Sequence, residues 1–219
     1  MPAFEPTLDS ADLSACIDAR ESAASLNARL AKADAFWPLS LDSQQSLGAL
    51  FLSAKACARS FRFGGLGDNV LGLAWRLPNG VRVDLGGRVV KNVVGFDWVR
   101  FLAGSQGRFG QPELLVLRLR PRPEAEQVLS LSGALPALRA VARSIRSSSW
   151  AHVLDALDLE NDTQGSRLLC CLSGKAAVLP LFETQAQHWA QEHALTLQAG
   201  LSLPERLAQP WARIQAPVD

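Results

Sequence analysis

The chain has 219 residues, which is enough for one large domain or two small ones. Its 22 basic and 21 acidic residues nearly cancel, so composition does not point to nucleic acid, whose binding proteins usually carry a concentrated basic face. No apolar run reaches the roughly 18 residues of a membrane-spanning helix, and the N-terminal stretch is acidic where a signal peptide is basic, so we expect a cytoplasmic protein without a transmembrane segment.

A strand and then a helix are expected at the start of the chain. Residues 12–20 alternate between apolar and polar positions, which predicts a strand. Ser22 is a residue type that caps helices, and Leu26 and Leu30 recur after it at helical spacing. We expect this helix to end at Trp37-Pro38, because the residue before a proline disfavours helical geometry.

The next part of the chain is punctuated by glycine and proline. Residues 43–59 form a segment of small residues that is either helical or irregular. The turn signal at Pro78-Asn79-Gly80 predicts a β-hairpin over residues 70–85. Asp68 stands at a glycine turn just before this hairpin, and we expect its carboxylate to hold the turn by accepting backbone N–H bonds.

The stretch from Gly86 to Gly110 is the densest in glycine, with six in 25 residues. Such a cluster indicates tight turns or a close approach of the backbone to another group. Lys91, Asn92 and Asp97 are the polar residues set among these turns. Successive backbone N–H groups in glycine turns can cradle an anionic or carbonyl-rich ligand. Asp97 is expected mainly to cap a short helix over residues 98–103.

The composition changes after Pro123, which we take as a domain boundary between residues 1–123 and 124–219. The elements expected around and after it are a strand over 113–120, a helix over 135–145, strands over 150–159 and 167–172, and a helix over 176–193.

The cysteines and histidines do not form a metal-binding pattern. None of the four cysteines forms a C-x-x-C pair, and His188 and His193 are poorly spaced for ligands on one helical face. Cys170 and Cys171 are expected to be small buried residues on opposite faces of a strand rather than part of a disulfide framework. No metal site is therefore predicted.

The glycine-rich stretch contains an ordered series of residues: Gly87, Lys91, Asn92, Gly95, Asp97, Gly104, Ser105 and Gly107. This series closely resembles the flavin-binding fold of the FAD-linked oxidases of the vanillyl-alcohol oxidase type, and in particular the FAD-binding subunits of glycolate oxidases. The resemblance is strongest over residues 46–123. It implies an α+β fold, with a truncated FAD-binding (PCMH-type) domain at 1–123 and a shortened α/β cap domain at 124–219.

The resemblance also implies a set of residues around a non-covalently bound FAD. Asn92 and Asp97 would organise the loop, and Lys91 either offsets phosphate charge or is simply a solvated side chain. Catalytic residues remain unassigned, because the cap offers no evident proton acceptor. The implied cofactor-binding residues are Ser46, Gly48, Val89, Val90, Asn92, Asp97, Gly104, Ser105 and Gly107.

The chain also departs from the family pattern on the expected flavin face. Arg20-Glu21 replaces the usual Ala-Gly, Ala49 replaces a glycine, and Lys55 and Cys57 stand in a normally small and polar loop. Residues 1–20 contain no counterpart of the family's glycine-rich loop for the FAD pyrophosphate.

Two functions are consistent with these features. The first is an FAD-binding, oxidoreductase-type subunit that acts on 2-hydroxy acids together with partner subunits, as in a glycolate-oxidase-like complex. The alternative is a non-catalytic truncated relative that no longer binds FAD and serves as a structural or assembly subunit. The retained glycine series favours the first, and the missing pyrophosphate loop favours the second.

Overall fold

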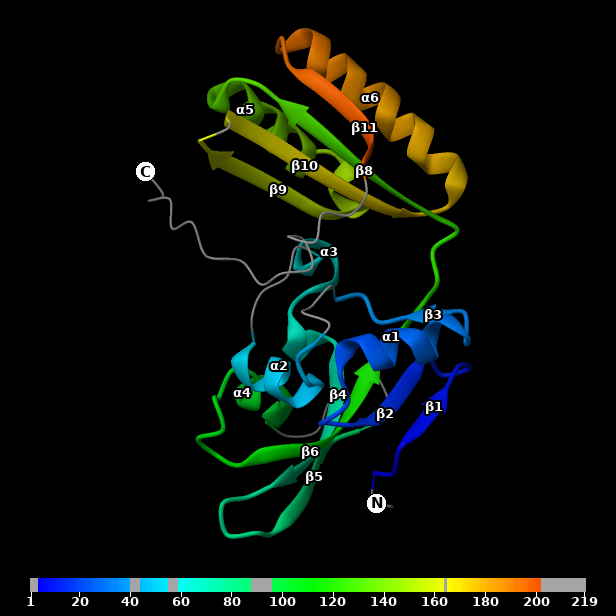
Figure 1. The fold of residues 1–219 in the computed structure, drawn as a ribbon, viewed down its shortest axis with the longest axis vertical. Helices are drawn as coiled ribbons and strands as arrows, with labels where there is room; N and C mark the ends of the chain where they lie inside the picture. Colours follow the sequence, from blue (N-terminus) through cyan, green and yellow to red (C-terminus); the bar gives the residue numbers. More distant parts are fainter. Residues whose placement is uncertain (1–3, 40–43, 55–58, 88–95, 164, 202–219) are drawn as a thin grey trace. The chain divides into compact units, whose positions relative to one another are not determined.

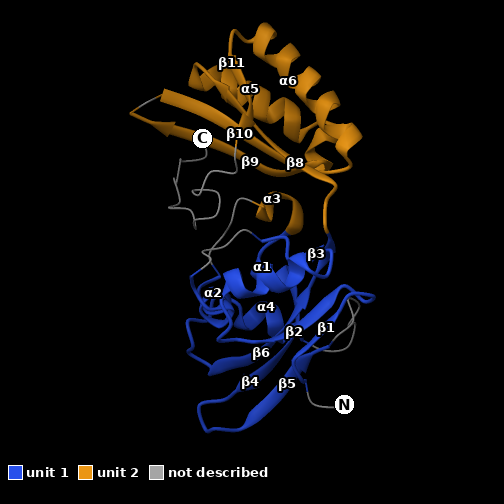
Figure 2. Ribbon diagram, turned by 45° about the vertical axis from the view of Figure 1, so that its right-hand side comes forward, with its two compact units in different colours: residues 1–57, 64–121, 208–219 blue, residues 58–63, 122–207 orange. Residues whose placement is uncertain are grey.

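The computed structural model describes residues 4–39, 44–54, 59–87, 96–163 and 165–201. Backbone contacts divide these residues into two compact units (Figure 2). The first unit takes the described residues up to 54 and those from 64 to 121, and the second takes 59–63 and 122–201.

The first unit is built on a five-stranded antiparallel sheet in the order β1-β2-β6-β4-β5 (Figure 1). The hairpin expected over residues 70–85 is confirmed as β4 and β5, and the strand expected over 12–20 is confirmed as β2. The bounds are β1 Thr7–Asp9, β2 Ser14–Asp18, β4 Val70–Arg76, β5 Arg82–Gly86 and β6 Gln111–Arg118.

Three helices of the first unit contribute to its main apolar core: α1 (Ala23–Ala31), α2 (Leu47–Ser53) and α4 (Trp98–Leu102). Shorter elements complete the unit: the 3-10 helix η1 (Leu66–Asp68) and the small two-stranded sheet of β3 (Ala35–Phe36) and β7 (Arg120–Pro121). The core therefore lies between the helices and one face of the large sheet, with Ile17 and Leu117 among its fully buried strand residues.

The helix after β2 begins as predicted but ends earlier. Ser22 caps α1, its hydroxyl accepting the N–H of Ser25 at 3.2 Å. The helix ends at Ala31 and not at the Trp37-Pro38 boundary expected from proline. The chain turns at Asp34, whose φ of 50° is left-handed, and this turn leads into β3. A local backbone reversal, rather than the proline, terminates the helix.

The second unit has a four-stranded antiparallel sheet in the order β11-β8-β10-β9, with two long helices in its apolar core. Their bounds are β8 Ala125–Ser132, α5 Leu135–Arg146, β9 Leu154–Asp162, β10 Gly165–Gly174, α6 Leu179–Glu192 and β11 Thr196–Leu201. The 3-10 helices η2 (Ser149–His152) and η3 (Ala176–Val178) lie between them. The strand expected from Trp150 is wrong in its first residues, because the Ser148 hydroxyl accepts the Trp150 N–H and starts η2.

The two adjacent cysteines of β10 are both buried, and each belongs to a different side of the sheet, as predicted. Cys170 pairs with Leu157 within the core that includes α5 and α6, whereas Cys171 pairs with Ala156 on the opposite side. Burial raises the pKa of the Cys171 thiol to about 12 and raises that of Cys170 as well. Both thiols are therefore protonated and unreactive at neutral pH.

A short helix from the first half of the chain, α3 (Ser60–Phe63), packs with the second unit. The Arg62 guanidinium contacts Asp155 at 2.7 Å and also donates to the carbonyl oxygens of Val153 and Ser173 at 3.3 and 3.1 Å. Arg59, at the start of the same segment, pairs with Glu126 of β8 at 2.8 Å. These contacts tie residues 59–63 to three strands that follow much later in the sequence.

Candidate cofactor-binding site

Two predicted site residues, Ser46 and Gly48, lie at the N-terminus of α2. The Ser46 hydroxyl accepts the N–H of Ala49 at 3.2 Å and so caps the helix. The N–H of Gly48 donates to the Ala19 carbonyl at 2.7 Å. A Cβ atom at Gly48 would lie 2.9 Å from that same oxygen, so the close approach of α2 to the chain after β2 requires glycine.

Replacement of Gly48 by alanine should therefore destabilise the protein by about 1–3 kcal/mol, the usual cost of overpacking a tight contact. Gly65 is the matched control, because a Cβ there would meet only one atom, at 3.9 Å, and its φ of −83° suits any residue. Urea denaturation should give Gly65→Ala a stability within about 0.5 kcal/mol of the wild type. Equal effects of the two substitutions would contradict the packing explanation.

Asp97 and Asp68 occupy the structural roles predicted for them. Asp97 caps α4, its carboxylate accepting the N–H of Arg100 at 3.1 Å. Asp68 holds its glycine turn by accepting the N–H of Gly65 at 2.9 Å. The other oxygen of Asp68 contacts the Arg100 guanidinium at 2.5 Å. Arg100 thus links the turn before β4 to the helix that follows the glycine-rich stretch.

Gly104, Ser105 and Gly107 form the turn after α4. Gly104 and Gly107 both have a φ of 78°, a left-handed value that favours glycine. The N–H groups of Gly104 and Gln106 donate to the carbonyls of Phe51 and Leu52 at 2.9 and 3.0 Å. The turn is therefore fastened to the C-terminal end of α2. Thus α2 carries Ser46 and Gly48 at one end and contacts the turn at the other.

Several of the predicted contact groups are already engaged within the protein. The N–H groups of Gly48, Gly104 and Ser105 donate to protein carbonyls, so they are not available to a ligand in this conformation. The Ser105 hydroxyl is different, because its oxygen is buried and has no hydrogen-bond partner within the described ranges. The remaining predicted residues, Val89, Val90 and Asn92, lie outside the described residues, as does Lys91.

The residues at Arg20-Glu21, where the sequence departs from the family pattern, form ion pairs. Arg20 contacts Asp18 at 2.6 Å, and its hydrogen bond lowers the pKa of the Asp18 carboxyl to about 2. Glu21 pairs with Arg29 of α1 at 2.7 Å, while its backbone carbonyl accepts the N–H of Leu47 at 2.9 Å. The substituted pair therefore stands beside the start of α2.

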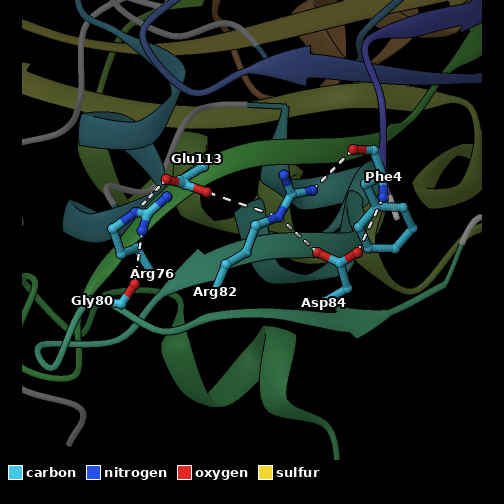
Figure 3. Close-up of polar contacts among 6 residues, drawn as sticks. All are labelled: Phe4, Arg76, Gly80, Arg82, Asp84 and Glu113. Carbon is cyan, nitrogen blue, oxygen red and sulfur yellow. Dashed lines mark hydrogen bonds and ion pairs between the residues drawn. The ribbon is translucent and has the colours of Figure 1, made fainter. Parts of the chain in front are cut away.

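A polar pocket of about 540 Å³ adjoins this region and is lined by Asp18, Arg20, Arg82 and Glu113 among others. Glu113 of β6 contacts Arg76 at 2.5 Å and lies 3.9 Å from Arg82 (Figure 3). Arg82 also lies 3.3 Å from Asp84. These side chains pair with one another across three strands, so the pocket's charges are largely compensated.

Asp158, in the second unit, was not singled out by the sequence analysis. It is 7% exposed on β9, and its Oδ2 atom has no hydrogen-bond partner among the described residues. Desolvation, assisted by the nearby Glu160 carboxylate, raises the Asp158 pKa to about 7. The available signal was the segment LDALDLE, which places three acids in a strand of apolar residues.

Among the described residues there is no group of three or more His, Cys, Asp or Glu side chains arranged to hold a metal ion. Within the same ranges, none of the helices combines the length and the apolar character needed to cross a membrane.

Comparisons with known proteins extend these observations. No family model matches the chain. It is 32% identical over 99 residues to the mitochondrial D-lactate dehydrogenase [cytochrome] of Arabidopsis thaliana, which covers 45% of this chain and 18% of that protein. It is 35% identical over 71 residues to the glycolate oxidase subunit GlcD of Bacillus subtilis (strain 168), which covers 32% of this chain and 15% of that protein. The matched part is thus less than a fifth of either relative.

Solved structures of alkyldihydroxyacetonephosphate synthase, in two crystal forms, are similar in fold over most of the chain. One has a TM-score of 0.76 at 15% identity and covers 92% of this chain and 43% of that chain; the other has a TM-score of 0.73 at 16% identity, with coverage of 91% and 45%. The chain therefore has the α+β fold of the FAD-binding (PCMH-type) proteins, as predicted. The partial sequence matches to the two curated relatives agree with the predicted resemblance to the FAD-linked oxidases.

Proposed function

We propose that the chain is part of an FAD-linked oxidoreductase that acts on 2-hydroxy acids. The observation that carries this proposal is the fold match over 92% of the chain together with the local sequence matches. Lactate and glycolate, named in the two curated relatives, are both 2-hydroxy acids. Because one relative is named as a subunit, we also propose that the chain works with partner subunits. Residues 1–123 would form the flavin-binding part and 124–219 the cap.

The cofactor in this proposal is FAD, bound without a covalent link. Among the predicted residues, the Ser105 hydroxyl best fits a contact with this cofactor, because it is buried and makes no hydrogen bond to any described residue. Ser105 and Gly107 would contact the cofactor from the turn that α2 and α4 hold in place. FAD, when bound, would accept the hydride from the substrate carbon. The role of this chain's residues is to bind and orient it.

A titration with FAD tests the proposal. We expect the wild-type chain to change the fluorescence and visible spectrum of added FAD. Ser105→Ala should weaken binding by about fivefold to tenfold, the effect of losing one hydrogen bond. Ser144→Ala, at an exposed position on α5, should bind like the wild type. A folded wild-type chain that leaves the FAD spectrum unchanged would contradict the proposal.

One observation favours the second candidate, a non-catalytic structural or assembly subunit without flavin. The engaged N–H groups of Gly48, Gly104 and Ser105 give the glycine turns a purely structural purpose. Under this alternative, the chain should be folded by circular dichroism and yet should not perturb FAD at any concentration tested. In that case Ser105→Ala and Ser144→Ala should be indistinguishable in every FAD titration.

A further inference from the structure

An apolar pocket of about 530 Å³ lies in the first unit, where α4 packs against β4 and β5. Its volume is within the usual range of small-molecule pockets, roughly 300–1,000 Å³. Trp75 and Leu102 line it as buried residues, and Trp98, Phe101 and Phe109 line it as exposed ones.

The buried side of the pocket presents no free polar group. Trp75 is 1% exposed, and its indole N–H donates to the Phe109 carbonyl at 2.9 Å. Gly110 makes this contact possible, because a Cβ there would lie 2.7 Å from the indole nitrogen and 2.1 Å from the Arg76 carbonyl oxygen. The indole is therefore fixed in orientation, with its one donor already used.

The exposed side is a cluster of aromatic rings. Trp98, Phe101 and Phe109 are 49%, 46% and 47% exposed, which is high for such large apolar side chains. Trp98 and Phe101 meet edge to face, with ring centroids 5.8 Å apart, and Phe101 and Phe109 are 5.2 Å apart. A planar aromatic molecule could extend this arrangement, since further rings would meet the same faces and edges.

Arg108 is the charged residue of the pocket. Its side chain has no hydrogen bond or ion pair with any residue that the structure describes. By contrast, Arg76, Arg82 and Arg100 of the same unit each pair with a carboxylate. A guanidinium beside apolar walls is well suited to a planar carboxylate, which it can bind through two parallel hydrogen bonds.

We propose that this pocket binds an aromatic carboxylate, with the ring against Trp98, Phe101 and Phe109 and the carboxylate on Arg108. The site goes beyond the proposed function and does not depend on FAD. Volume, aromatic lining and one unpaired cation all specify the same ligand chemistry: a flat apolar body that bears a single negative charge.

Two fluorescent probes with nearly the same aromatic body separate the ring contribution from the charge contribution. 1-Anilinonaphthalene-8-sulfonate is an anion, and N-phenyl-1-naphthylamine is its neutral counterpart. We expect wild type to bind both. Arg108→Gln should weaken the binding of the anionic probe by about tenfold, because one charge-assisted contact is lost. It should change the binding of the neutral probe by less than about twofold. Phe101→Ser should weaken both. Arg139→Gln, at an exposed position on α5, should change neither.

Competition then tests the carboxylate directly. 1-Naphthoate should displace the neutral probe from wild type at concentrations about tenfold lower than 1-naphthamide, and Arg108→Gln should abolish that difference. Equal binding of the anionic probe to wild type and Arg108→Gln would overturn the proposal. Displacement of the neutral probe by FAD in preference to 1-naphthoate would also overturn it, because the pocket would then belong to a flavin site. The FAD titration of Ser105→Ala remains an independent test of the proposed function.

Discussion

Replacement of Arg62 by alanine should lower the free energy of unfolding by about 3 kcal/mol at pH 7, the typical effect of leaving a buried charge without its partner. Asp155 is fully buried, and burial raises its pKa even though Arg62 lies 2.7 Å away. Without Arg62 the carboxylate keeps only the hydrogen bond with Ser173 and the charge of Arg59, so it must either stay charged with less compensation or take up a proton. The loss in stability should therefore shrink as the pH is lowered and the carboxylate takes up a proton. Urea denaturation followed by circular dichroism measures both effects.

Arg20 provides a matched control for this prediction. Its contact with Asp18 is 2.6 Å long, but the Arg20 side chain is 91% exposed. Arg20→Ala should change stability by less than about 1 kcal/mol, because exposed ion pairs contribute little. The double variant Arg62→Ala with Asp155→Asn should recover part of the loss, since it removes the stranded charge. Equal losses for Arg62→Ala and Arg20→Ala would show that burial of Asp155 is not the cause.

The parts of the fold that sequence could predict depend on neighbouring residues. Ser22 and Asp97 cap their helices because a hydroxyl or carboxylate at that position reaches an N–H three residues later. The hairpin over 70–85 follows from a turn signal between two apolar runs. In each case the determining interaction spans only a few residues, so the pattern is visible in the sequence.

Long-range packing accounts for what the sequence did not predict. The attachment of residues 59–63 to β9 and β10 depends on Arg62 and Asp155, which are 93 positions apart. Strand β8 was missed because no motif marks it; it forms by pairing with β10 and β11. Likewise, the aromatic pocket joins residues of β4, β5 and α4 that no short motif connects.

The candidate cofactor site falls between these two cases. The resemblance identified Ser46, Gly48, Gly104 and Ser105 from a spacing pattern. In the structure, Ser46 and Gly48 lie at the start of α2, and Gly104 and Ser105 lie in the turn that is hydrogen-bonded to its other end. What the spacing does not encode is the direction of each N–H group, which depends on neighbouring carbonyls such as those of Ala19 and Phe51. The binding role of these residues thus stays a prediction, whereas their structural contacts are observed.

The second large effect we expect is a pH dependence of stability that arises from Asp158. Its pKa is about 7 in the folded protein against a reference value of 3.8. Between these two values the unfolded chain releases the proton that the folded protein retains, so the unfolded state binds fewer protons and stability falls as pH rises. The total loss approaches about 4 kcal/mol, at 1.36 kcal/mol per pKa unit, and is complete once the pH exceeds about 7.

Asp158→Asn isolates this contribution, because an amide of similar size does not titrate. Three neighbours act on the Asp158 carboxyl: Glu160 raises its pKa, whereas the backbone hydrogen bond of Leu159 and the charge of Arg167 lower it. All three remain in the variant. We expect the stability of Asp158→Asn, relative to wild type, to increase steadily from pH 4 to pH 7.5 in urea denaturation. Asp162→Asn, at an exposed position on the same strand, is the matched control. A constant difference between Asp158→Asn and wild type across this range would mean that the buried carboxyl titrates near its ordinary pKa, and that the environment of β9 is more polar than its burial suggests.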